Sequence, residues 1–566
     1  MPIRHFVPQN FNASDLAEVL PVYESLLNRT IDSAAELERW LLDCSELSSV
    51  LDEYASRRYI EKSCHTDDKA IEARYLQYIE EVEPKTKPLF FQLQKKYLAS
   101  PFRAQLTGKR YEMLERKWRA EVELFREENV AIETEVAKLG NEYDKISGAM
   151  MVHFDGEELT LQQMARFQEK TDRALRQRAW EASSNRRMID AEPIENIFGV
   201  MLNLRSKMAR NAGMDHYRSF VWKSYKRFDY TPEQCLSFAD AIAESVVPLV
   251  KDLNRHRCQD LGISTLRPWD LAVDPHHRPP LVPFKEDQIG DFVEKTRQIF
   301  DRLSPALAEE FDSLRKNNNL DLDSRKGKQP GGYQCNLDEV REPFIFMNAA
   351  GLHRDVEVLL HEGGHAFHSI AAKEEPLTYL RNAPMEFCEV ASMSMELLGA
   401  DHFDVFYNEA DAARAKRSLI EGIIRFLPWM TTIDSFQHWI YTHPGHSPAE
   451  RTAHWNALLD RFFGDVDWSG LEPVRSASWQ KQLHLFQYPF YYIEYGIAQL
   501  GALQLWMKSR VDPRQALSNY RAALALGGTK TLPELFATAG IQFDFSTKTL
   551  LPLMDALREE LAALPR

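Results

Sequence analysis

The chain has 566 residues, of which 44% are hydrophobic and 27% are charged, values that are ordinary for a globular protein. A chain of this length can bury a large core without disulfide bonds. With 84 acidic and 69 basic residues the formal net charge is −15, which argues against a nucleic-acid partner, because phosphate binding needs clustered lysine and arginine.

The cysteine spacing and the N-terminal sequence indicate the cellular compartment of the protein. Six cysteines are spread along the chain without a C-x-x-C pair, which favours free thiols in a reducing environment. The first residues lack the basic start and apolar run of a secretion signal. The most apolar later stretch, 493–507, is too short to span a bilayer. We therefore expect a cytoplasmic protein with no membrane partner.

Helices are predicted along most of the chain. The segment 110–146 is rich in Glu, Lys, Arg, Ala and Leu without proline, which is typical of one or two long helices. Residues 231–234, Thr-Pro-Glu-Gln, predict a helix start with a cap, an N-terminal proline and a Gln three residues after the cap. Irregular segments are expected at 265–285, 326–332 and 443–448, where proline or glycine gathers.

The best strand candidate is 342–348, Glu-Pro-Phe-Ile-Phe-Met-Asn. Strands are otherwise scarce, so a small sheet is expected. An open edge of this strand would bind an extended peptide by strand addition, and the glycine-rich loop before it could close over the peptide. The substrate-binding candidates here are Gly331, Gly332 and Tyr333 of the loop and Phe344, Ile345 and Phe346 of the strand.

The sequence His-Glu-Gly-Gly-His at 361–365 is the central motif. On a helix, residues four apart share one face, so His361 and His365 can reach one Zn²⁺, with Glu362 beside the metal-activated water as a general base. The motif also arises by chance. The glycine pair inside it costs a helix roughly 1 kcal/mol per glycine relative to alanine. Close approach of another backbone would explain the pair.

A second helix with carboxylates is predicted from 385 to 396. Catalytic zinc usually takes three protein ligands and leaves one position open. Glu389 is the expected third ligand, and Glu386, one turn earlier, is the alternative. Glu396 lies on nearly the same face as Glu389 and is expected to orient a ligand histidine.

These motifs resemble the thimet oligopeptidase / oligoendopeptidase F family of zinc metallopeptidases. The matching segments are 331–333, 343–348, 361–368 and 389–392. The resemblance implies a mainly α, two-lobed metallopeptidase with a deep central channel, zincin-like catalytic helices and a small β-sheet near the active site.

In this organisation, residues 1–200 form a mainly helical N-terminal lobe. Residues 201–566 form the catalytic lobe, with its core at about 325–510.

The segment 484–495 is rich in tyrosine. Amide hydrolysis produces an oxyanion that needs donors besides the metal. Pro489 suits a helix start, which would place Tyr492 and Tyr495 on the first turns. The resemblance gives the catalytic role at the oxyanion to His484, Tyr492 and Tyr495, with Tyr488 and Tyr491 as further substrate contacts.

The predicted function is that of an endopeptidase with one zinc ion per chain, which hydrolyses internal bonds of short unstructured peptides. Glu362 would take the proton from water and pass it to the leaving amine. Two alternatives stay open. One is a catalytically silent helical peptide-binding protein with a structural zinc, and the other is a zinc hydrolase of a non-peptide amide.

Overall fold

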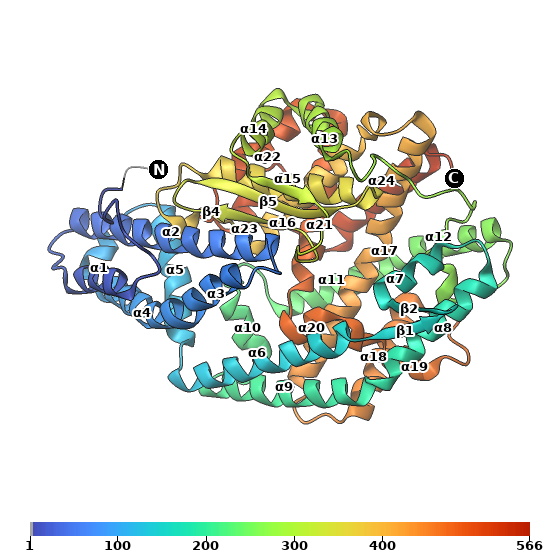
Figure 1. The fold of residues 1–566 in the computed structure, drawn as a ribbon, viewed down its shortest axis with the longest axis horizontal. Helices are drawn as coiled ribbons and strands as arrows, with labels where there is room; N and C mark the ends of the chain where they lie inside the picture. The colour runs from blue at the N-terminus through green and yellow to red at the C-terminus, as the bar shows by residue number, and fades with distance from the viewer. Residues whose placement is uncertain (1–3) are drawn as a thin grey trace.

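The computed structural model describes residues 4–566 and is mainly helical, with two small sheets (Figure 1). The predicted mainly α fold with a small sheet is therefore confirmed. No helix within residues 4–566 is long and apolar enough to cross a membrane.

The N-terminal helices gather at one end of the molecule, drawn in blue in Figure 1. They are α1 (Leu16–Asn28), α2 (Ala34–Cys64), α3 (Lys69–Gln77), α4 (Glu83–Ala99) and α5 (Lys109–Leu124). Their hydrophobic cluster runs from Val7 to Trp118 and takes in Leu377 and Leu380 from the later chain. The N-terminal helices thus have a core of their own, which is joined to the rest of the molecule through that later segment.

The next part of the chain runs along the bottom and the right side of Figure 1. It contains α6 (Glu127–Gly148), the hairpin of β1 (Met151–Phe154) and β2 (Glu157–Thr160), α7 (Leu161–Ala165), α8 (Arg173–Ile189) and α9 (Ala191–Asn211). The predicted helical segment 110–146 is confirmed as two helices, α5 and α6. At the break between them, the Nε atom of Arg126 donates to the carbonyl of Asn211 at 3.0 Å.

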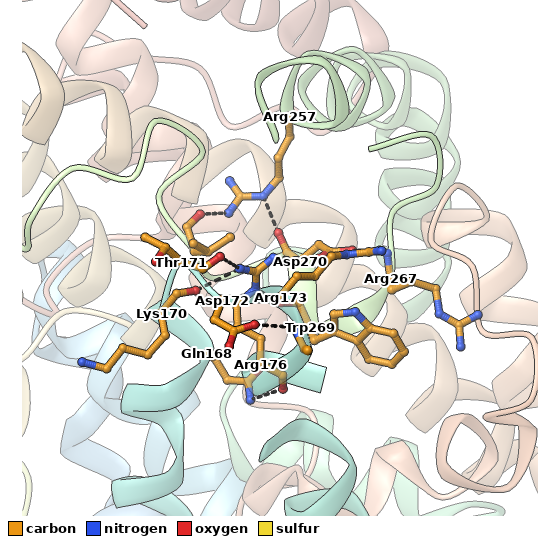
Figure 2. Close-up of polar contacts among 12 residues, drawn as sticks. Gln168, Lys170, Thr171, Asp172, Arg173, Arg176, Arg257, Arg267, Trp269 and Asp270 are labelled. Carbon is orange, nitrogen blue, oxygen red and sulfur yellow. Dashed lines mark hydrogen bonds and ion pairs between the residues drawn. The ribbon is translucent and has the colours of Figure 1, made fainter. Parts of the chain in front are cut away.

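A buried ion cluster fixes α8 to the irregular segment 265–285 (Figure 2). The fully buried carboxylate of Asp270 accepts from Arg173 at 2.7 Å and from Arg176 at 3.0 Å. Arg257, near the end of α12 (Val247–Leu261), donates to the carbonyl of Asp270 at 2.7 Å. Since a buried charge is tolerated only when paired, these contacts hold the crossing segment in one position.

The remaining helices and a three-stranded sheet make up the rest of the molecule, with the sheet in its upper part in Figure 1. The first of them are α10 (Tyr217–Ser224), α11 (Pro232–Ser245), α13 (Ile289–Leu303), α14 (Pro305–Lys316), α15 (His353–Ala372), α16 (Met385–Ala400) and α17 (Glu409–Thr442). They are followed by α18 (Pro448–Phe463), α19 (Glu472–Ser476), α20 (Leu483–Gln487), α21 (Tyr492–Val511), α22 (Pro513–Leu524), α23 (Leu532–Thr538) and α24 (Thr547–Ala563). The helix start predicted at 231–234 is confirmed, with both hydrogen bonds of a capping box present. The largest hydrophobic cluster extends from Leu124 to Leu561.

The sheet has the order β3–β5–β4, with β3 (Leu320–Asp323) parallel and β4 (Tyr333–Leu337) antiparallel to β5 (Glu342–Ala349). The strand predicted at 342–348 is confirmed, but the expectation that it offers an open edge is wrong, because β5 is paired on both sides. The side chains of Phe344, Ile345 and Phe346 are buried. β4, which follows the glycine-rich loop, is an edge strand of this sheet.

The glycine pair of the central motif lies where α15 meets its neighbours. A Cβ atom on Gly364 would lie 2.5 Å from the carbonyl oxygen of Ala391 and 2.6 Å from the Cα of Ser392 in α16. A Cβ atom on Gly363 would lie 2.7 Å from the ring of Phe300. The expected close approach of another backbone is thereby confirmed at Gly364.

Candidate metal centre

Two helices bring the three expected metal ligands together. His361 and His365 lie one turn apart on α15, and Glu389 lies on α16. The Oε2 atom of Glu389 is 3.5 Å from Nε2 of His361 and 3.7 Å from Nε2 of His365. All three ligand atoms lie within 4.8 Å of one another.

These separations fit a zinc ion. They exceed an ordinary N–H···O distance, whereas two ligands about 2.1 Å from one tetrahedral ion lie about 3.4 Å apart. The side chains of His361 and His365 are 23% and 18% exposed, so one side of the trio is open to solvent. The donor set of two imidazoles and one carboxylate with an open position is that of a catalytic site rather than a closed structural one.

Glu386, the alternative ligand, lies in a different contact network. Its carboxylate accepts from the hydroxyl of Tyr230 at 2.6 Å and lies 3.8 Å from Nε of Arg227. Glu389 is therefore the carboxylate of α16 that faces the two histidines.

Glu396 contacts His361 as expected. Its Oε1 atom is 2.6 Å from Nδ1 of His361, which turns the Nε2 atom toward Glu389. Burial alone would lower the pKa of His361, but the hydrogen bond and charge of Glu396 outweigh it and raise the pKa to about 9. Burial lowers the pKa of His365 well below its usual value, which keeps that imidazole neutral, the form that binds metal.

Replacing Glu396 with alanine should lower zinc affinity by about 10- to 100-fold, because His361 loses the partner that orients its ring. Competition with a chromophoric chelator measures this directly. The exposed Glu374→Ala is the matched control and should bind zinc as the unmodified chain does. Equal affinity in both variants would remove Glu396 from the site.

Glu362 is buried beside the trio and next to the sheet. Burial raises the pKa of Glu362 to about 7, against the lowering effects of His361 and of a hydrogen bond from the backbone N–H of Gln334. Gln334 belongs to β4, so this bond places the edge strand next to Glu362.

The loop before β4 is held against its surroundings. Asn348 donates from Nδ2 to the carbonyl of Gly331 at 2.8 Å. A Cβ atom on Gly332 would lie 3.5 Å from the side chain of Val358 in α15, so the loop passes beside the metal helix. The ring of Tyr333 stacks on Phe346 with centroids 4.8 Å apart.

The histidine and tyrosines of 484–495 form one cluster. The ring of His484 lies 4.6 Å from that of Tyr492, and the ring of Tyr495 lies 5.2 Å from Tyr491 and 5.8 Å from Tyr492. The hydroxyl of Tyr491 donates to Oε1 of Glu389 at 3.1 Å, which joins this cluster to the metal trio. Tyr488 is 50% exposed at its rim.

The helix expected to start at Pro489 starts three residues later, at Tyr492. Phe490 has a φ of +65°, a left-handed conformation that a bulky residue rarely adopts and that interrupts the helix. Arg227 donates to the carbonyl of Phe490 at 2.5 Å and to Glu494 at 2.7 Å, and the N–H of Phe490 donates to Gln437 at 2.6 Å. Sequence reasoning missed Arg227 and Gln437 as residues that hold this segment, because no local sequence pattern marks such long-range contacts.

A second trio, Cys235, Asp434 and His438, also has its ligand atoms within 4.8 Å of one another. All three side chains are buried, and the rings of Trp222 and Phe490 pack on His438. This trio has no open side for water or substrate, so the His361 trio is the candidate catalytic centre.

The three candidate ligands lie in a part of the chain that matches a protein-family model. Residues 166–552 match the model of peptidase family M3, and residues 6–125 match the peptidase M3 N-terminal domain. The chain belongs to peptidase family M3.

Solved structures match 99% of the chain. A structure assigned provisionally to oligoendopeptidase F is 28% identical with a TM-score of 0.88, and the alignment covers 99% of each chain. PZ peptidase A, solved with an inhibitor, is 27% identical with a TM-score of 0.89 and the same coverage.

Curated relatives of this M3 chain match over shorter stretches. The oligoendopeptidase F homolog of Borreliella burgdorferi is 25% identical over 221 residues, which is 37% of this chain and 36% of that protein. The homolog of Mycoplasma pneumoniae is 24% identical over 334 residues, 55% of this chain and 52% of that protein. These alignments thus span about a third to a half of the relatives.

Proposed function

We propose that this chain is a zinc-dependent endopeptidase that hydrolyses internal bonds of short unstructured peptides, with one zinc ion held by His361, His365 and Glu389. The observation that carries the proposal is the partly exposed trio on α15 and α16, with Glu362 beside it, in a chain of peptidase family M3.

When bound, zinc would polarise a water molecule and the scissile carbonyl. Glu362 is the general base: it accepts a proton from water during attack and passes it to the leaving amine. Its position supports this role, because Glu362 follows the ligand His361 directly on α15 and lies beside β4, where the peptide is proposed to bind.

His484, Tyr492 and Tyr495 are proposed to donate to the oxyanion. Gln482 donates from Nε2 to Nδ1 of His484 at 2.9 Å, so the proton of the neutral imidazole is on Nε2, where it can be donated. Burial lowers the pKa of His484 to about 4, which keeps the ring neutral. Tyr491 is assigned a different part, that of holding the ligand Glu389.

The peptide is proposed to add as a strand to β4, the strand whose Gln334 lies next to Glu362. Gly331 and Gly332 precede this strand and would lie along the bound peptide. A deep channel between two lobes, divided near residue 200, is the proposed route to the trio. A reducing cytoplasm is the proposed location, supported by six free cysteines.

Mass-spectrometric mapping of cuts in a mixed pool of short peptides and one folded protein tests the proposal. We expect internal cuts in the short peptides alone, lost on chelation and restored by zinc. Binding of peptides without any cuts would instead favour the silent peptide-binding protein. Hydrolysis confined to a non-peptide amide would favour the other alternative.

A further inference from the structure

A cavity of about 570 Å³ lies between α8, α17, α18 and the segment that leads into α20. Its walls are mostly apolar and include the indole rings of Trp180, Trp429 and Trp468. One wall is the segment around Asp270 that the ion cluster of Figure 2 holds in place, since Pro268 and Leu271 line the cavity. A concave apolar space of this size suits part of a small organic or peptide ligand.

Two cations line this apolar cavity without a counter-ion. Arg187 comes from α8 and Lys481 from the turn before α20. Within residues 4–566, neither side chain forms an ion pair or a side-chain hydrogen bond. The nearby carboxylate of Asp270 is already paired with Arg173 and Arg176. The ammonium of Lys481 lies 5.4 Å from the ring centroid of Trp429.

The two cations line the same cavity and carry the same charge. Desolvation by the surrounding cavity walls and the charge of Arg187 lower the pKa of Lys481, and desolvation lowers the pKa of Arg187. Both residues line the cavity and are exposed to solvent at its edge, so a ligand can reach them. A carboxylate between them would relieve the repulsion and form charge-assisted hydrogen bonds.

The cavity adjoins the cluster assigned to the oxyanion. Gln482, next to Lys481, is the hydrogen-bond partner of His484. One turn before Trp429 on α17, the ring of Phe426 lies 6.1 Å from that of Tyr492. On both elements, a residue of the cavity wall is therefore followed or preceded, within one turn, by a residue that contacts this cluster.

We propose that this cavity binds the C-terminal residue of the peptide substrate, with its carboxylate between Arg187 and Lys481 and its apolar side chain among the three tryptophans. A C-terminal residue combines the two features that the cavity matches, one anionic group and one apolar group. This inference rests on the proposed peptidase function, which it deepens by naming a specificity site.

The test compares one peptide sequence with a free C-terminal carboxylate and the same sequence as the C-terminal amide. We expect kcat/KM to be about 10- to 100-fold higher for the free acid, the range of one or two charged hydrogen bonds. In the double variant Arg187→Gln/Lys481→Gln the acid-to-amide ratio should fall to near one. Lys251→Gln, exposed on α12, is the control and should keep the ratio.

Equal kcat/KM for acid and amide, or a ratio that survives in the double variant, would overturn the inference. An amidated peptide ending in Glu that is cut as well as the free acid would also overturn it, since the site would then read a side chain.

If no peptide is cut, the peptidase proposal fails. Binding of the acid and amide peptides then tests separately whether the cavity holds a C-terminal residue. Tryptophan fluorescence follows the titration, because three indoles line the site. Acid-selective binding that the double variant loses would support the cavity assignment, whereas equal binding of acid and amide would refute it.

Discussion

Replacing Glu362 with glutamine should leave the zinc content unchanged and lower kcat for a cleaved peptide by about 10²- to 10⁴-fold, the usual contribution of a general base. Glutamine has the shape of glutamate and can still accept the hydrogen bond from the backbone of Gln334. It cannot take a proton from water at neutral pH. The loss should therefore appear in turnover rather than in folding or metal binding.

A quenched fluorescent peptide gives kcat and KM, and elemental mass spectrometry gives zinc per chain. Glu309→Gln, on the exposed face of α14, is the matched control and should turn over as the unmodified chain does. Unchanged turnover in Glu362→Gln would refute the base assignment. Loss of zinc from this variant would move Glu362 from proton transfer to metal binding.

Replacing Gly364 with alanine should destabilise the protein by about 3 kcal/mol or more, at the upper end of overpacking effects. The added Cβ would meet the carbonyl oxygen of Ala391 and the Cα of Ser392, both of them backbone atoms that cannot rotate away. α15 and α16 would have to separate. Because Glu389 lies two residues before Ala391, separation also moves it from His361 and His365, and zinc affinity should fall with stability.

The matched control is the same substitution in α17. Nothing lies within 4 Å of a Cβ atom on Gly422, so Gly422→Ala should stabilise the protein by roughly 0.5–1 kcal/mol, the helix propensity gained. Thermal melting and zinc titration of both variants measure the difference. If Gly364→Ala melts at or above the temperature of Gly422→Ala, the close contact between α15 and α16 does not require glycine at position 364.

The local parts of the site could be predicted from sequence because they depend on spacing along one element. Two histidines four apart share a helix face whatever surrounds the helix. The capping box at Thr231 and the apolar run of β5 are equally local signals. Family-specific motifs then indicated the peptidase class, and the match to peptidase family M3 confirms it.

Neighbour relations between elements could not be predicted in the same way. Sequence reasoning assigned an open edge to β5, yet β3 and β4 pair with it on both sides. Strand pairing depends on which other segments reach the sheet, and a strongly apolar strand such as β5 is more typical of a covered position.

The sequence by itself determined the helix that carries the candidate ligands His361 and His365 and the proposed base Glu362, because helical periodicity fixes these residues relative to one another. Only the tertiary structure decided that Glu389 rather than Glu386 faces them, since packing at Gly364 sets the rotation of α16. The same holds for the bond from Tyr491 to Glu389. Such contacts join segments about a hundred residues apart, and long-range packing, not local pattern, brings them within reach.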